Sequence, residues 1–211
     1  YDFVGLGFEL AFKYRNPVML LSDGAIGQMM EKVEVREQKP RLTEEQIREK
    51  YPWAVNGKSK HHQQKVITSL ELESAKMEEF NQKLIDKYKL LDDKEVRFEE
   101  IQCEDADYLM IAYGTSARIC QKTVEIARDE GIKVGLLRPI TLFPFPKKRL
   151  LELADQLKGI LSVEMSAGQM IEDIRLAVNG KVPVEHYGRM GGLIPSTEEA
   201  LDVLKQKIIG G

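Results

Sequence analysis

The sequence predicts an α/β protein whose C-terminal half forms a doubly wound, mostly parallel sheet. From residue 106 to residue 211, short apolar runs alternate with helical segments, which is typical of parallel strands joined by right-handed crossovers. Residues 34–105 are richer in charge than the whole chain, which is 31% charged, and this predicts a charged helical connector. Residues 1–33 carry helix, strand and helix signals without a second strand, which indicates part of another α/β domain.

The segment 1–33 begins with apolar residues at helical spacing, namely Phe3, Leu6, Leu10 and Tyr14. Pro17 ends this helix, Val18–Leu21 reads as a buried strand, and a short helix is expected from Ala25 to about Val33. A lone strand leaves unpaired backbone groups on both edges. We therefore expect residues 1–33 to be the tail of a larger domain, which docks on the C-terminal domain, pairs with another copy or lies disordered.

The connector contains two predicted helices. Thr43 followed by Gln46 predicts a capping box at the start of a short helix, and Leu70–Leu91 reads as a long amphipathic helix. Between these helices, His61 and His62 lie in a polar loop. No third ligand is near them and the neighbouring lysines repel a cation, so no metal site is expected there.

Residues 106–211 predict four strands and four helices in alternation. The strands are expected at Tyr108–Tyr113, Val134–Leu137, Gly159–Glu164 and Val182–Tyr187. The helices are expected at Ala117–Glu130, Lys147–Leu157, Ala167–Asn179 and from Ser196 to Ile209. Ser196 and Glu199 form a capping box at the start of the last helix.

Ligands and partners of such sheets meet the carboxyl ends of the strands. The candidates for anion or partner contacts at these ends are Gly114, Thr115, Ser116, Arg118, Arg138, Glu164, Gly168, Gln169 and Arg189. Arginines on one edge suit an anion or an acidic surface, and we expect Arg138 to meet an acidic group of a neighbouring domain. Gly114–Ser116 also reads as an ordinary tight turn with a helix cap. No Gly-x-Gly-x-x-Gly fingerprint occurs, which disfavours a dinucleotide.

Composition and motifs exclude several classes of function. With 31 basic and 34 acidic residues the net charge is −3, which argues against a nucleic-acid binder. No run of 18 apolar residues predicts a membrane span. Cys103 and Cys120 are too few to hold an iron–sulfur cluster on this chain alone, and two isolated cysteines suit a reducing cytoplasm. No nucleophile elbow or phosphate-binding loop occurs, so no catalytic residue is predicted in this segment.

Five strings of the sequence resemble one enzyme family. The string 16–31 (NPVMLLSDGAIGQMME) resembles the end of the pyrimidine-binding domain of 2-oxoacid:ferredoxin oxidoreductases. The strings 113–118 (YGTSAR), 137–146 (LRPITLFPFP), 163–170 (VEMSAGQM) and 187–192 (YGRMGG) resemble the next domain of that family, which is similar to the transketolase C-terminal domain. The whole pattern is most similar to the alpha subunit of the 2-ketoisovalerate (branched-chain) branch.

The resemblance implies oxidative decarboxylation of a 2-oxo acid with CoA to an acyl-CoA and CO2, with electrons passing to ferredoxin. Thiamine diphosphate, Mg²⁺ and [4Fe-4S] clusters are then expected mainly on other segments or on beta, gamma and ferredoxin-like subunits. Asp23, Gly24, Gly27 and Gln28 match the family string, and their expected role is domain or subunit packing. Two alternatives stay open: a subunit of another thiamine-dependent complex, either transketolase-like or a 2-oxoacid dehydrogenase, and a non-catalytic partner-docking module.

Overall fold

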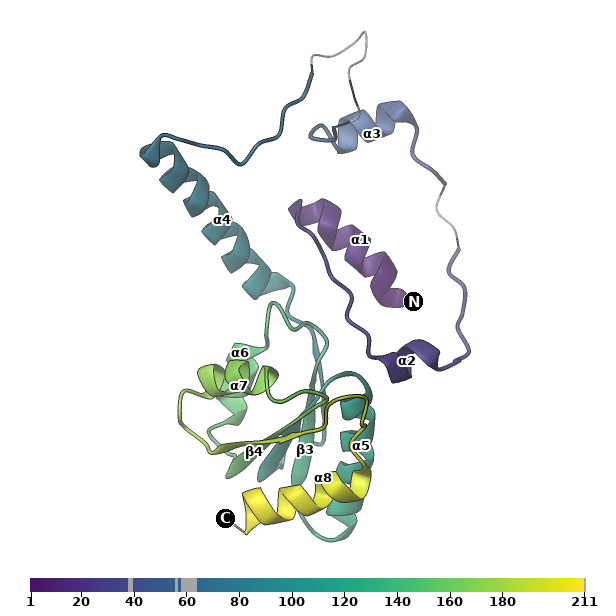
Figure 1. The fold of residues 1–211 in the computed structure, drawn as a ribbon, viewed down its shortest axis with the longest axis vertical. Coiled ribbons are helices and arrows are strands. Elements are labelled where there is room, and N and C mark those ends of the chain that lie inside the picture. Colours follow the sequence, from purple (N-terminus) through teal and green to yellow (C-terminus); the bar gives the residue numbers. More distant parts are fainter. Residues whose placement is uncertain (38–39, 56, 58–63, 211) are drawn as a thin grey trace. The chain divides into compact units, whose positions relative to one another are not determined.

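A computed structural model describes residues 1–37, 40–55, 57 and 64–210 of the chain (Figure 1). These residues form two compact units. One unit contains residues 30–85 together with residue 1, and the other contains Asp2–Met29 together with the chain from Asp86 onward. The expected histidine pair, His61 and His62, lies outside the described residues.

Among its described residues, the unit formed by residues 30–85 contains helix α3 (Glu44–Lys50) and the first part of helix α4 (Ser74–Lys94), and the remainder is irregular. Helix α3 begins with the predicted capping box, in which the Gln46 backbone N–H donates to Thr43 Oγ1 and the Thr43 N–H donates to Gln46 Oε1. Helix α4 starts four residues later than the sequence predicts. Before it, the N–H of Leu70 donates to the Thr68 hydroxyl, and local bonds of this kind compete with a helix.

The second unit contains a five-stranded sheet in the order β1-β3-β2-β4-β5. Its strands are β1 (Phe98–Ile101), β2 (Tyr108–Ile111), β3 (Val134–Pro139), β4 (Gly159–Glu164) and β5 (Val184–Gly188). The last four strands pair in parallel and β1 pairs with β3 in antiparallel orientation. The predicted doubly wound, mostly parallel sheet is therefore confirmed.

Strand β1 corrects the prediction in one place, because Phe98–Ile101 lies within the segment 34–105 that we expected to be a helical connector. The strand sits at the edge of the sheet, and Glu99 lies opposite Arg138 of β3 in its register. An edge strand with two glutamates carries no apolar alternation, so the sequence pattern did not indicate it.

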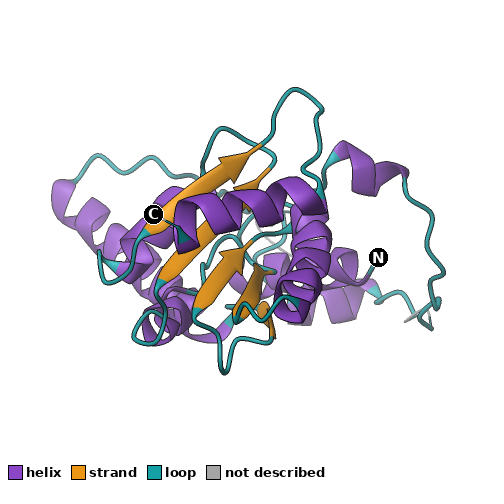
Figure 2. Cartoon of the chain, turned by 90° about the horizontal axis from the view of Figure 1, so that it is seen from below, coloured by secondary structure: helices purple, strands orange, loops and turns teal. Residues whose placement is uncertain are grey.

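Helices cover both faces of the sheet. Helix α5 (Gly114–Asp129), helix α8 (Thr197–Val203) and the π-helix η1 (Leu204–Ile209) pack against Met110 of β2 and Leu161 of β4. Helices α6 (Lys147–Leu153) and α7 (Met170–Val178) pack against Leu109 and Ile160 on the opposite face. Figure 2 shows the C-terminal helix lying across one face of the strands. The sheet is thus buried on both sides, as its continuous apolar strands require.

Strand β5 is one of the two edge strands of the sheet. The ladder to β4 uses the carbonyl of Pro183 and the N–H of Arg189, so the alternate residues Val184 and His186 turn their carbonyls outward. Arg175 Nη2 donates to the Val184 carbonyl at 3.2 Å, and Lys207 Nζ donates to the His186 carbonyl at 3.1 Å. The outward carbonyls of Val184 and His186 are therefore occupied by side chains of the same chain.

Residues 2–29 form helix α1 (Asp2–Tyr14), an extended stretch and helix α2 (Gly24–Gln28). The expected buried strand Val18–Leu21 is wrong, because these residues are in no strand and their exposure ranges from 41% to 80%. The helix expected from Ala25 to about Val33 is likewise shorter and ends at Gln28. Four apolar residues become a strand only beside another strand, and none of the described strands pairs with them.

Helix α1 is attached to the sheet domain through Glu95, which follows α4 and is only 4% exposed. The Glu95 carboxylate accepts hydrogen bonds from the Tyr14 hydroxyl, from Lys13 Nζ at 2.7 Å and from Arg97 Nη2 at 2.9 Å. Burial by itself would raise the pKa of Glu95, but these donors lower it to about 2. Of the three arrangements expected for residues 1–33, the structure shows docking on the C-terminal domain for residues 2–29.

Candidate functional site

The candidate site is the carboxyl edge of β2 and β4. These two strands are neighbours, yet β2 continues into α5 on one face of the sheet and β4 continues into α7 on the other. Doubly wound sheets bind ligands at such a switch point, outside the carboxyl ends of the two strands. The structure brings together here most of the predicted residues, namely Gly114, Thr115, Ser116, Glu164, Gly168 and Gln169.

Glu164 is the last residue of β4 and is 1% exposed. Its carboxylate accepts five hydrogen bonds, from the hydroxyls of Ser162 (2.8 Å) and Ser166 (3.0 Å) and from the backbone N–H groups of Gln169 (2.9 Å), Met170 (2.9 Å) and Ile171 (3.0 Å). Burial alone would raise the pKa of Glu164, but the N–H groups at the start of α7 hold it below its usual range. The ionised carboxylate is therefore used to cap α7.

Two glycines make room for His186 beside this carboxylate. A Cβ atom at Gly188 would lie 2.5 Å from His186 Cε1 and would collide with the Ser166 carbonyl oxygen, and a Cβ at Gly168 would lie 3.6 Å from His186 Nε2. His186 Nε2 is 3.8 Å from Glu164 Oε1, which is too long for a hydrogen bond. Close packing therefore requires glycine at position 188, whereas at position 168 the left-handed φ of +111° favours glycine.

Asp23 reaches the same edge from the N-terminal segment. Its Oδ1 atom accepts from the Ile26 N–H at 2.9 Å and from the Thr115 hydroxyl at 3.0 Å, and its Oδ2 atom accepts from the Thr115 N–H at 3.2 Å. Burial would raise the pKa of Asp23, and the hydrogen bonds from Ile26 and Thr115 outweigh it, so the pKa lies below the usual range. The predicted packing residue thus makes a packing contact with α5.

The other members of the packing group behave differently. Gly24, Gly27 and Gln28 lie exposed in α2, and a Cβ at either glycine would meet nothing within 4 Å in the described part of the chain. Packing within these residues therefore gives no reason for glycine at positions 24 and 27, and their role in subunit contacts stays a prediction.

Tyr113 is a residue that the sequence analysis did not select. It occupies the N-cap position of α5 without a side-chain cap bond and is partly buried. Burial, together with the negative charges of Glu164 and Asp23, raises the pKa of the Tyr113 hydroxyl. The only signal for it in the sequence is its place directly before Gly114 at the end of a strand.

Arg138 forms an ion pair within the sheet domain. Its partner is Glu99 of the adjacent strand β1, with Nη1 and Oε2 2.6 Å apart, and the expected contact with an acidic group of a neighbouring domain stays a prediction. Both side chains are more than a third exposed, so the pair contributes little to stability. Of the other candidates after β2, Arg118 is exposed and Ser116 is buried.

Arg189 lies beyond β5 and is tied to the start of α8. Its Nη1 atom is 3.4 Å from Glu199 Oε1, and the Tyr187 hydroxyl donates to Glu199 Oε2 at 2.6 Å. Burial and this hydrogen bond raise the pKa of Tyr187 to about 12. Arg189 Nε is buried and has no hydrogen-bond partner in the described part of the chain. Arg189 therefore links the segment after β5 to the first turn of α8 through an ion pair.

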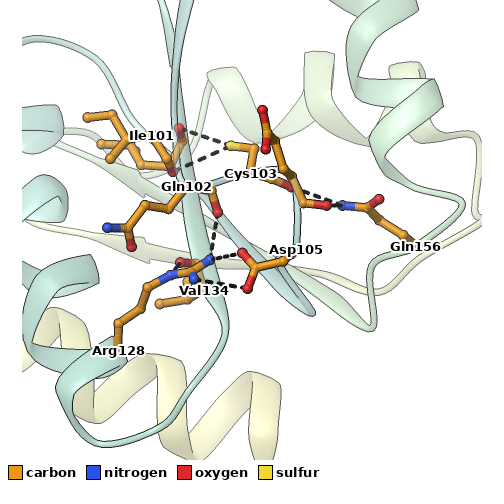
Figure 3. A network of polar contacts seen from close by, with 9 residues as sticks. Ile101, Gln102, Cys103, Asp105, Arg128, Val134 and Gln156 are labelled. Atoms are coloured by element: carbon orange, nitrogen blue, oxygen red, sulfur yellow. Dashed lines mark hydrogen bonds and ion pairs between the residues drawn. The ribbon is translucent and has the colours of Figure 1, made fainter.

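A half-open cavity of about 490 Å³ lies at the opposite, amino-terminal edge of the sheet. Figure 3 shows its polar network, in which Arg128 donates to Asp105 at 2.8 Å and to the carbonyls of Gln102 and Val134. The Cys103 thiol donates to a backbone carbonyl, and burial raises its pKa to about 11, so it is not an activated nucleophile. Among the described residues, no group of three His, Cys, Asp or Glu could hold a metal ion.

Comparisons with known proteins agree with this architecture. Residues 106–200 match the family described as "Pyruvate:ferredoxin oxidoreductase core domain II". In fold, the chain is similar to 2-oxoglutarate:ferredoxin oxidoreductase from Magnetococcus marinus, solved with 2-oxoglutarate, coenzyme A and succinyl-CoA bound. That match has a TM-score of 0.58 and 24% identity, and it covers 65% of this chain and 24% of the other.

Two curated proteins are similar along nearly the whole chain. The "Ketoisovalerate oxidoreductase subunit VorB" of Methanothermobacter thermautotrophicus is 46% identical over 201 residues, which are 94% of this chain and 54% of that protein. The "2-oxoglutarate synthase subunit KorA" of Methanothermobacter marburgensis is 31% identical over 233 residues, which are 100% of this chain and 60% of that protein. The chain thus spans little more than half the length of the curated relatives it matches.

Proposed function

From this homology to 2-oxoacid oxidoreductase subunits, we propose that the chain acts in a 2-oxoacid:ferredoxin oxidoreductase that uses ketoisovalerate. The observation that carries the proposal is the 46% identity to a ketoisovalerate oxidoreductase subunit over 94% of this chain. The 2-oxoglutarate synthase relative is 31% identical, so the branched-chain substrate is favoured over 2-oxoglutarate. The reaction would yield acyl-CoA, CO2 and reduced ferredoxin.

We further propose that the chain belongs to the alpha subunit. The relatives carry the subunit names VorB and KorA, so the last letter of the name does not distinguish an alpha subunit from a beta subunit. Support comes from the order of segments, in which residues resembling the end of a pyrimidine-binding domain precede the core domain II match at 106–200. Beta, gamma and ferredoxin-like subunits, ferredoxin and CoA are then its partners in the complex, which we expect in the cytoplasm. Among the described residues, no helix is long and apolar enough to cross a membrane.

The two cysteines and the two carboxylates at the carboxyl edge do not fit the metal centres of such a complex. Cys103 and Cys120 are buried in the cores on opposite faces of the sheet, so they are not placed to share an iron–sulfur cluster. Asp23 and Glu164 accept hydrogen bonds from helix N-termini and are not free for Mg²⁺. We therefore assign thiamine diphosphate, Mg²⁺ and [4Fe-4S] clusters to other parts of the complex, and to this chain a role in assembly and domain packing.

The test is the activity of the complex that contains this chain. Reduction of a viologen dye is measured with CoA and with ketoisovalerate, 2-oxoglutarate or pyruvate as substrate. The proposal predicts a kcat/KM for ketoisovalerate at least tenfold above that for the other two acids, and no turnover by the chain alone. A preference for 2-oxoglutarate or pyruvate would refute the substrate assignment. Inactivity with all three acids would favour another thiamine-dependent complex or a docking module.

A further inference from the structure

Helix α5 takes its N-terminal cap from a residue 92 positions away. Tyr113 stands at its N-cap position but makes no side-chain cap bond. The Asp23 carboxylate supplies one instead, accepting from the Thr115 N–H at 3.2 Å and from the Thr115 hydroxyl at 3.0 Å. Because orphan N–H groups at a helix start need an acceptor, the first turn of α5 depends on this distant carboxylate.

The same carboxylate caps α2. Its Oδ1 atom accepts from the Ile26 N–H, and the carbonyl of Asp23 accepts from the Gly27 N–H at 3.0 Å. Helix α2 has only five residues, and a helix of that length does not persist in water without outside contacts. One carboxylate therefore serves the starts of two helices that lie far apart in the sequence.

Gly114 leaves the room that this arrangement needs. Its φ of +59° is in the left-handed region, and a Cβ atom there would lie 3.1 Å from Asp23 Oδ2. The turn after β2 thus leaves space for the Asp23 carboxylate at the start of α5.

We propose that Asp23 is a shared cap that couples the two helices, so that α2 is helical only while Asp23 is docked on α5. Release of Asp23 from Thr115 then uncaps α5 and unfolds α2 in the same event. If the proposed function holds, α2 belongs to the end of the pyrimidine-binding domain, and this contact transmits the position of that domain to the core domain II segment. That consequence rests on the proposed function, whereas the coupling rests on the contacts alone.

The coupling is tested by NMR on the full chain, without any activity assay. Thr115→Val removes the hydroxyl, and Thr115→Ser keeps it as the matched control. The valine variant loses the hydroxyl bond to Asp23 Oδ1 and keeps the backbone N–H bond to Oδ2, so the contact is weakened and not abolished. We therefore expect the Cα secondary shifts of Ala25 and Ile26 to lose part of their helical value in T115V and to be retained in T115S. A change in T115V confined to the first turn of α5 would overturn the proposal.

A pH titration of the same samples gives an independent readout. The Ile26 and Thr115 amide protons bond to one carboxylate, so both shifts should report a single midpoint below 3.8, the usual pKa of an aspartate. Asp23→Asn should abolish the titration at both amides, and Asp202→Asn, on exposed α8 surface, should leave it unchanged. Two separate midpoints would overturn the coupling. An inactive complex with an intact shared midpoint would refute the proposed function only.

Discussion

Replacing Glu95 by Gln removes the charge that holds helix α1 on the sheet domain. Glu95 is 4% exposed and accepts from Lys13, Tyr14 and Arg97, so the neutral variant leaves two cations beside an uncharged amide. A glutamine side chain has almost the same shape as a glutamate. The change in stability therefore reports the charge and its hydrogen bonds, without a cavity contribution.

The magnitude follows from the pKa of Glu95, which is about 2 against the usual 4.5. Each pKa unit corresponds to about 1.4 kcal/mol, so ionised Glu95 stabilises the folded chain by about 3 kcal/mol. Because the pKa is lower in the folded state than in the unfolded state, this stabilisation is complete above about pH 5. It is lost as the pH falls from about 4.5 to about 2.

The assay is urea denaturation followed by far-UV circular dichroism between pH 7 and pH 3. We expect the free energy of unfolding of Glu95→Gln to be about 3 kcal/mol below that of wild type at pH 7. At pH 3 this difference should be about half as large. Glu125→Gln is the control, because Glu125 forms an exposed pair with Lys122 and its loss costs less than about 0.5 kcal/mol. The assignment of Glu95 as the residue that holds α1 on the sheet domain is wrong in either of two cases. The first is that Glu95→Gln loses no more stability than this control at pH 7. The second is that the stability difference between Glu95→Gln and wild type does not change with pH.

Three further changes test the carboxyl edge by the same denaturation assay. Glu164→Gln turns an amide NH2 toward the N–H donors at the start of α7 and should lower the free energy of unfolding by about 2–4 kcal/mol. A loss below about 1 kcal/mol would mean that the cap of α7 by Glu164 is dispensable. Gly188→Ala places a methyl group against the Ser166 carbonyl and the His186 ring, so it should lower the free energy of unfolding by about 1–3 kcal/mol or prevent folding. Its control is Gly27→Ala, which should be neutral or slightly stabilising because the new methyl group meets no atom of the described residues within 4 Å. Arg138→Ala should lower the free energy of unfolding by less than about 1 kcal/mol, because its pair with Glu99 is exposed. A larger loss of stability, or failure of the complex to assemble, would support the expectation that Arg138 meets a neighbouring domain.

The sequence predicted those parts of the fold whose signals are local. The strand Gly159–Glu164 has the predicted bounds, and both predicted capping boxes, at Thr43 and Ser196, are present. Each of these features depends on residues within a few positions of one another. Alternation of such segments was enough to predict the parallel sheet and its two layers of helices.

The features that the sequence did not predict depend on distant partners. Val18–Leu21 has the composition of a buried strand but no neighbouring strand in the described chain, and Phe98–Ile101 became a strand because β3 lies beside it. Asp23, Thr115, Glu164 and Gln169 were all selected as candidate residues, but the hydrogen bonds between them were not predicted. The contact of Asp23 with Thr115 closes a loop of 92 residues, and no periodicity in the sequence records such a contact.

The covered edge of β5 bears on how this protein behaves at high concentration. An edge strand normally offers a row of free acceptors that recruits strands from other molecules and starts aggregation. Arg175 comes from the face of the sheet that carries α7, and Lys207 comes from the face that carries η1, so the two side chains close over the edge from both sides. An incoming strand would have to displace both cations from the Val184 and His186 carbonyls before it could pair there. Growth of the sheet into a fibre from this edge is therefore opposed by two positive charges as well as by the occupied carbonyls.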